Sequence, residues 1–109
     1  MLVKDIAQKM QLINISGEDN LETEVKGCYI GDLLSLVMSR ASEGDAWITV
    51  QGNVNVVAVA SLNECAMVII AEGMKLDDAA LKRAKSESIP VFVSEKSAFE
   101  LACEIKELL

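Results

Sequence analysis

Apolar positions along the second half of the chain follow two alternating patterns. Short apolar runs of strand length lie at Trp47–Gln51, Met67–Ala71 and Val91–Val93. Between and after them, apolar residues return every three or four positions, the spacing of an amphipathic helix. Strands that alternate with helices in this way favour a parallel sheet joined by right-handed crossovers.

The helices of this half are predicted from their end signals. Asn53 precedes the first, Asp77 and Asp78 open the second with Leu76 placed to pack on Leu81, and Ser94 or Ser97 precedes the third. The terminal helix has an inward stripe formed by Ala98, Leu101, Ala102, Ile105 and Leu108.

The segment Val54–Cys65 is ambiguous. Its four valines favour a strand, whereas one helical face would hold Val54, Val57, Ala58, Ser61, Leu62 and Cys65. Because Asn53 can cap a helix and no turn residue divides the segment, we predict a helix.

The first half is predicted to contain two helices and two short strands. A helix over residues 2–10 leads to a strand at Leu12–Ile15, and Leu21–Val25 alternates like a half-exposed strand. Asp32 is placed to cap a second helix that Gly44 closes. The inward face of that helix would hold Leu33, Leu34, Val37, Met38 and Ala41. Together these elements predict one α/β domain over residues 1–109, a three-layer sandwich whose short, mostly parallel sheet of four to five strands has helices on both faces.

Composition excludes several classes of function. The chain has no histidine, so it lacks the usual general base and the commonest metal ligand, and we expect no metal and no cofactor. A net charge of -7 opposes binding to nucleic acid. The three cysteines, Cys28, Cys65 and Cys103, form no CxxC pair; we interpret them as small buried hydrophobes, with a redox role as the alternative.

No segment predicts export or membrane insertion. The N-terminus lacks an apolar stretch of signal-peptide type, and the most apolar window, Val54–Ala71, contains Glu64. We therefore expect a soluble, cytoplasmic protein.

Candidate binding residues gather where the predicted strands end. Ligands of open α/β sheets bind beyond the carboxyl ends of the strands, where helices also begin. The residues predicted at this edge that could contact a ligand are Gly31, Asp32, Gln51, Gly52, Asn53, Asn55, Glu72, Gly73 and Ser94. The competing interpretation is that the glycines serve tight turns and that Asp32, Asn53 and Ser94 only cap helices.

Catalytic chemistry has weaker support. The carboxylate pairs Glu18–Asp19 and Asp77–Asp78 lie in a turn and at a helix start, where solvation and capping explain them. Tyr29 could stack on a ligand or a partner, but packing is the simpler role. The alternative to a binding module is a small enzyme or phospho-acceptor that uses Asp32, Ser94 or Cys28.

Three segments resemble the DRTGG domain family in its short stand-alone form: Gly27–Met38, Gly44–Leu62 and Ile89–Leu101. The Asp-Arg-Thr-Gly-Gly string that names the family is absent from this chain. The resemblance implies a small α/β domain similar to the N-terminal domain of HPr kinase/phosphorylase, with an accessory role as a sensor or adaptor. It also implies a homodimer or homo-oligomer, a small-molecule or protein partner, and a link to redox or hydrogenase systems.

Overall fold

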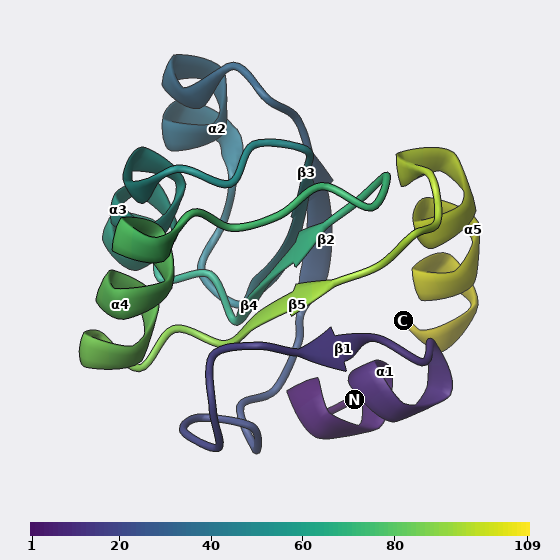
Figure 1. Cartoon of the computed structure of the whole chain (residues 1–109). Coiled ribbons are helices and arrows are strands. Elements are labelled where there is room, and N and C mark those ends of the chain that lie inside the picture. The colour runs from purple at the N-terminus through teal and green to yellow at the C-terminus, as the bar shows by residue number, and fades with distance from the viewer.

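Five strands form one sheet in the order β1-β5-β4-β3-β2 in the computed structural model, which describes residues 1–109 (Figure 1). β2, β3, β4 and β5 are parallel, and β1 joins β5 antiparallel. The strands are β1 (Ile13–Asn14), β2 (Gly27–Ile30), β3 (Asp45–Thr49), β4 (Met67–Ile70) and β5 (Val91–Val93). The helices are α1 (Val3–Lys9), α2 (Leu34–Arg40), α3 (Val54–Leu62), α4 (Asp78–Ser86) and α5 (Ala98–Leu108).

The sheet separates two hydrophobic cores. On one face α2, α3 and α4 pack over Trp47, Val68 and Ile70. On the other face α1 and α5 pack over Ile48, Ile69 and Phe92, which are 0%, 0% and 1% exposed. Side chains of successive strand residues point to opposite faces, so each buried strand supplies both cores. The predicted three-layer sandwich with a mostly parallel sheet is confirmed.

Most predicted helix boundaries are confirmed, and their caps explain them. The Asn53 side chain accepts hydrogen bonds from the N–H groups of Asn55 and Val56, so residues 54–62 are helical. Asp77 caps α4 by accepting from Ala80 N–H. Ser97, and not Ser94, caps α5, where it forms a capping box with Glu100.

Four local predictions are wrong. Residues 21–25 form no strand, apart from a single bridge between Leu2 and Glu24, whereas Gly27–Ile30, for which no strand is predicted, is the edge strand β2. In α2 only Val37 is fully buried, while Leu33 and Met38 are 66% and 46% exposed, and the helix ends at Arg40 before Gly44 is reached.

The buried face of α3 also differs from the prediction. It consists of Val56, Val57, Val59 and Ala60, and Leu62 is 66% exposed. Because α3 is apolar on nearly every side, its periodicity could not identify the inward face.

The order of the strands determines where a ligand crevice can open. β2 to β5 are adjacent in chain order, and α2, α3 and α4 all return over the same face. The chain leaves β5 toward the opposite face to form α5, so the connections after β4 and β5 diverge (Figure 1). In open α/β sheets, such a divergence between neighbouring strands is the place where ligands bind.

No helix combines the length and the apolar composition needed to cross a bilayer.

Candidate functional site

Asp32 joins the ends of β2 and β3. Its Oδ1 accepts hydrogen bonds from the Thr49 hydroxyl at 2.7 Å and from Val50 N–H at 2.9 Å, and its carbonyl oxygen accepts from the Gln51 side chain at 2.5 Å. Trp47 Nε1 donates to the neighbouring Gly31 carbonyl at 2.9 Å. Asp32 is therefore not the helix cap that the sequence predicts: α2 begins after Leu33 without a side-chain cap.

We expect Asp32→Ser to lower the free energy of unfolding by about 2 kcal/mol. Serine is a good N-cap but is too short to reach both donors, so the hydroxyl of Thr49, which is 2% exposed, and Val50 N–H lose their acceptor. Asp77→Ser is the matched control, because it replaces a true cap by another and should change stability by less than about 0.5 kcal/mol. Urea denaturation measures both, and equal effects of the two changes would refute the assignment.

The next segment of this edge, residues 51–55, is fixed mainly by backbone contacts with the connection before α4. Gly52 C=O accepts from Asp77 N–H at 2.8 Å, and a Cβ at Gly52 would lie 1.9 Å from the Lys75 carbonyl oxygen. The Asn53 amide donates weakly to Gln51 Oε1, at 3.4 Å, while Asn55 is exposed. Hydrogen bonds within the protein therefore occupy most of the polar groups that were predicted to contact a ligand at this part of the edge.

Glu72, Gly73 and Ser94 meet where the chain diverges after β4 and β5. Glu72 N–H donates to the Lys96 carbonyl at 2.8 Å and Gly73 N–H to the Ser94 carbonyl at 2.9 Å, which fastens the two connections to each other. Gly73 has a φ of 67°, in the left-handed region that favours glycine, and the end of the Glu95 side chain lies where a Cβ would point, 2.3 Å from it.

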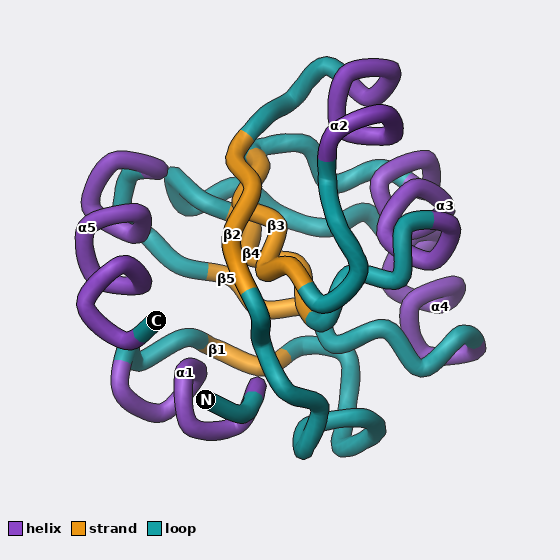
Figure 2. The backbone as a smooth tube through the Cα atoms, turned by 180° about the vertical axis from the view of Figure 1, so that it is seen from behind, coloured by secondary structure: helices purple, strands orange, loops and turns teal.

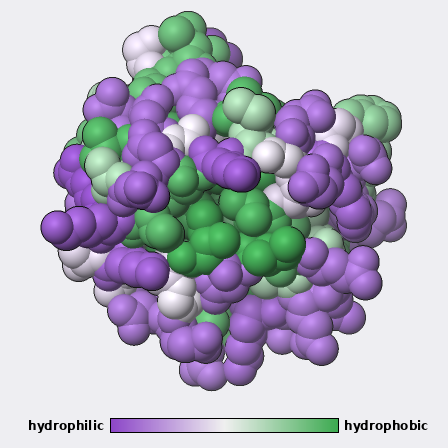
Figure 3. All heavy atoms as spheres, in the orientation of Figure 1, coloured by the Kyte–Doolittle hydropathy of each residue, from purple (hydrophilic) through white to green (hydrophobic).

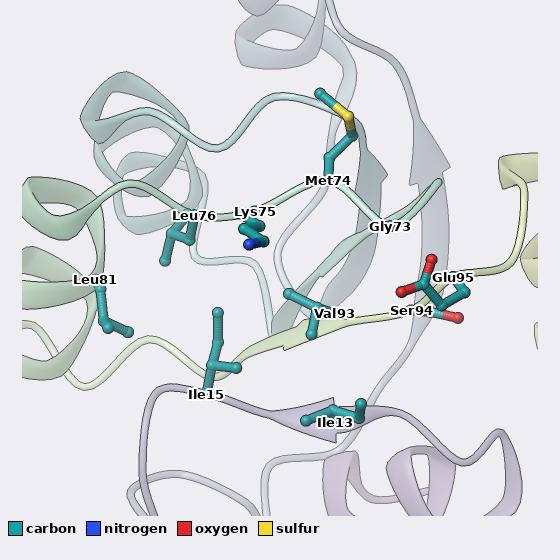
Figure 4. A pocket seen from close by; sticks show the side chains of 10 residues that line it. All are labelled: Ile13, Ile15, Gly73, Met74, Lys75, Leu76, Leu81, Val93, Ser94 and Glu95. Carbon is teal, nitrogen blue, oxygen red and sulfur yellow. The ribbon is translucent and has the colours of Figure 1, made fainter.

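A pocket of about 310 Å³ opens beside this junction. We call it the switch-point pocket. Its walls come from β1, β5, α4 and the two diverging connections, and its lining residues are Ile13, Ile15, Gly73, Met74, Lys75, Leu76, Leu81, Val93, Ser94 and Glu95 (Figure 4). Figure 3 shows the corresponding hollow as a hydrophobic area in the middle of the face that Figure 1 presents.

The polar groups of the switch-point pocket lie at its junction end. The Glu95 carboxylate points toward Gly73, and Ser94, which is 9% exposed, accepts from Lys96 N–H at 3.1 Å (Figure 4). Neither Lys75 nor Glu95 takes part in any ion pair of the chain. The pocket therefore combines apolar walls with one free cation, one free carboxylate and a hydroxyl.

Of the three thiols, Cys65 is buried and Cys28 is half-buried. Burial, with a smaller contribution from the Asp45 carboxylate, raises the pKa of both Cys28 and Cys65 to about 11. Both are therefore thiols at neutral pH, a form with little nucleophilic reactivity. Cys103 is exposed, so the interpretation of the three cysteines as buried hydrophobes is wrong for this residue, and no disulfide forms.

The nine predicted residues separate into two groups along the carboxyl edge. Gly31, Asp32, Gln51, Gly52, Asn53 and Asn55 surround the ends of β2 and β3, and Glu72, Gly73 and Ser94 lie at the ends of β4 and β5. Only Gly73 and Ser94 line the switch-point pocket. A ligand-binding role for any of the nine stays a prediction.

Sequence reasoning missed the apolar walls of this pocket. Ile13 lies in β1 and Ile15 directly after it, far away in the chain, and Met74 and Leu76 lie in the connection between β4 and α4. One signal in the sequence could have indicated these walls. Met74 and Leu76 are apolar residues in an otherwise polar connection, and Leu76 was already predicted to pack on Leu81.

Fold and pocket together define a small α/β sandwich with an apolar pocket at the divergence point of its sheet. The family model of the DRTGG domain matches residues 5–108, and the chain belongs to this family. The resemblance found in the sequence is thereby confirmed.

One solved structure similar to this chain is the crystal structure of the CBS and DRTGG domains of the regulatory region of Clostridium perfringens pyrophosphatase, complexed with the activator diadenosine tetraphosphate. The TM-score is 0.75 over 95% of this chain at 16% sequence identity, a likeness of fold. The chain corresponds to 45% of the length of that structure. A comparison with curated proteins finds no match.

Proposed function

We propose that this chain is a non-catalytic regulatory module that binds a small ligand in the switch-point pocket. The observation that carries the proposal is the position of the pocket, at the point of the sheet where connections leave for opposite faces. Its volume of about 310 Å³ and its mostly apolar lining fit a small-molecule site.

The lining favours a nucleotide-like ligand. Apolar side chains on both walls, among them Ile15, Leu76 and Val93, suit a flat heterocycle. The Glu95 carboxylate and the Ser94 hydroxyl can accept hydrogen bonds from a ring amino group, and the unpaired Lys75 can meet a phosphate. The similar pyrophosphatase regulatory region was crystallised with a nucleotide activator, which supports the same class.

The proposal includes a homodimer that acts as a sensor or adaptor. A link to redox or hydrogenase systems follows from the family resemblance and belongs to the same proposal. The alternative of a phospho-acceptor gains no support from the geometry, because Asp32 Oδ1 already accepts two hydrogen bonds and because β3 and β4 end at Thr49 and Ile70.

Thermal unfolding of the full chain with AMP, ADP, ATP and diadenosine tetraphosphate tests ligand binding. A nucleotide at 100 times its Kd should raise the Tm by roughly 10 °C, since it adds about 2.7 kcal/mol. Met74→Trp, which fills the pocket from its rim, should abolish the shift, and Met38→Trp, an equally exposed methionine on α2, should retain it. If no nucleotide raises the Tm, or if both variants respond alike, the proposal is wrong.

A further inference from the structure

Two charged residues line the switch-point pocket, and Glu95 is the one at its junction end. Glu95 lies in the connection between β5 and α5, and Gly73 lies in the connection between β4 and α4. Figure 2, the view from behind, shows α4 and α5 on opposite sides of the strands, so the two connections part at this point. The Glu95 carboxylate points toward Gly73 and into the pocket (Figure 4).

Both oxygens of this carboxylate are free to accept hydrogen bonds. No donor within the chain bonds to them, and no ion pair includes Glu95. Backbone hydrogen bonds fix the segment that carries the side chain, because Gly73 N–H donates to the Ser94 carbonyl and Glu72 N–H donates to the Lys96 carbonyl. The pocket therefore presents two unused acceptors on a fixed stretch of backbone.

A carboxylate with two free oxygens complements one nucleobase better than the others. An ionised carboxylate only accepts hydrogen bonds, and its two oxygens can take two parallel donors at once. Guanine offers this pair, since its ring N1–H and its exocyclic amino group lie side by side. Adenine and cytosine carry their amino group beside a ring nitrogen with a lone pair, so one carboxylate oxygen would face another acceptor.

We propose that the switch-point pocket prefers guanine nucleotides and that Glu95 determines this preference. The inference rests on the nucleotide-binding role in the proposed function and names the base. The Glu95 carboxylate accepts hydrogen bonds from N1–H and the amino group of guanine at the junction end. The ring lies between the apolar walls, and the phosphate extends toward Lys75.

The size and the walls of the pocket fit this orientation. A volume of about 310 Å³ is at the lower end of the range for ligand sites, so the pocket encloses a base and leaves the sugar and phosphate at its rim. Ile13 and Val93 form the apolar wall next to Glu95, and Lys75 lies apart from Glu95 along the pocket (Figure 4). Lys75 is exposed and in no ion pair, so its ammonium group is available to the phosphate.

Isothermal titration calorimetry of the full chain with GMP, IMP and AMP tests the preference. A hydrogen bond to a charged group changes affinity roughly tenfold to a hundredfold, so GMP should bind at least about tenfold more tightly than AMP. IMP has the ring N–H of guanine but lacks the amino group, so its affinity should fall between them. Equal affinities for GMP and AMP would overturn this inference alone. If none of the three binds, the proposed function fails as well.

Glu95→Gln tests the residue. The amide has nearly the shape of the carboxylate but offers one acceptor and one donor, the pattern that complements adenine. We expect this variant to bind GMP roughly tenfold more weakly and AMP more tightly, so that the preference is lost or reversed. Because Glu95 is exposed and has no partner in the chain, the change should leave the Tm without ligand unaltered.

Glu107→Gln is the matched control. It removes the same charge from another exposed carboxylate that forms no ion pair, on α5 and outside the lining of the pocket. Its affinities for GMP and AMP should equal those of the parent chain. A preference for GMP that persists in Glu95→Gln, or that weakens equally in both variants, would overturn the role of Glu95.

Discussion

Replacing Gly52 by alanine is expected to lower the free energy of unfolding by about 3 kcal/mol or more. A Cβ at this position would meet the Lys75 carbonyl oxygen at 1.9 Å and Leu76 Cα at 2.9 Å, and both belong to backbone. The connection between β4 and α4 would have to move, which breaks the hydrogen bond from Asp77 N–H to Gly52 C=O. Since total stability is typically about 5–15 kcal/mol, the loss would be a large part of it.

Gly31→Ala provides the control for Gly52→Ala. The nearest atom to a Cβ there is Tyr29 Cε2 at 3.1 Å, on a half-buried ring that can shift. We expect a change of less than about 1 kcal/mol, measured by urea denaturation followed by circular dichroism. Similar losses in the two variants would show that the contact with Lys75 is not what requires glycine at position 52.

Trp47→Ala should cost about 3–5 kcal/mol, the range for removing a large aromatic side chain from a core. Trp47 is 0% exposed in the centre of β3, where it contacts the core under α2, α3 and α4. Its indole Nε1 also holds the Gly31 carbonyl at the end of β2. Removing it therefore leaves a cavity and releases the connection that leads to α2.

Trp47→Phe separates these two contributions. Phenylalanine retains much of the packing but has no N–H donor, so the loss should be clearly smaller than for alanine, at about 1–3 kcal/mol. Because Trp47 is the only tryptophan, unfolding has to be followed by circular dichroism. If phenylalanine costs as much as alanine, cavity formation is not the main effect.

Local signals predicted the second half of the fold well. Asn53 and Asp77 are caps that act within their own helix, and Met67–Ile70 is buried on both faces, which explains its unbroken apolar run. Such features depend on neighbours in sequence, so a pattern can reveal them. The parallel sheet follows from the alternation of these elements.

The remaining errors come from contacts between distant residues. Asp32 has the composition and position of a cap, but the Thr49 hydroxyl and Val50 N–H compete for its carboxylate and determine its role. Gly27–Ile30 has a glycine at its start and carries a weak strand signal; pairing with β3 makes it a strand. The walls of the switch-point pocket come from opposite ends of the chain, so no local pattern could outline it.

The antiparallel pairing of β1 with β5 has a consequence for synthesis on the ribosome. Ile13 pairs with Val93, so β1 has no partner strand until the ribosome has added the 80 residues that follow Ile13. At about 5–20 residues per second, the N-terminal segment waits for several seconds. α1 buries Val3 and Ile6 in the core beneath α5, and these side chains stay exposed during that time. Chaperones can therefore reach α1 and β1 during this time, and docking of β1 onto β5 is a late event of folding.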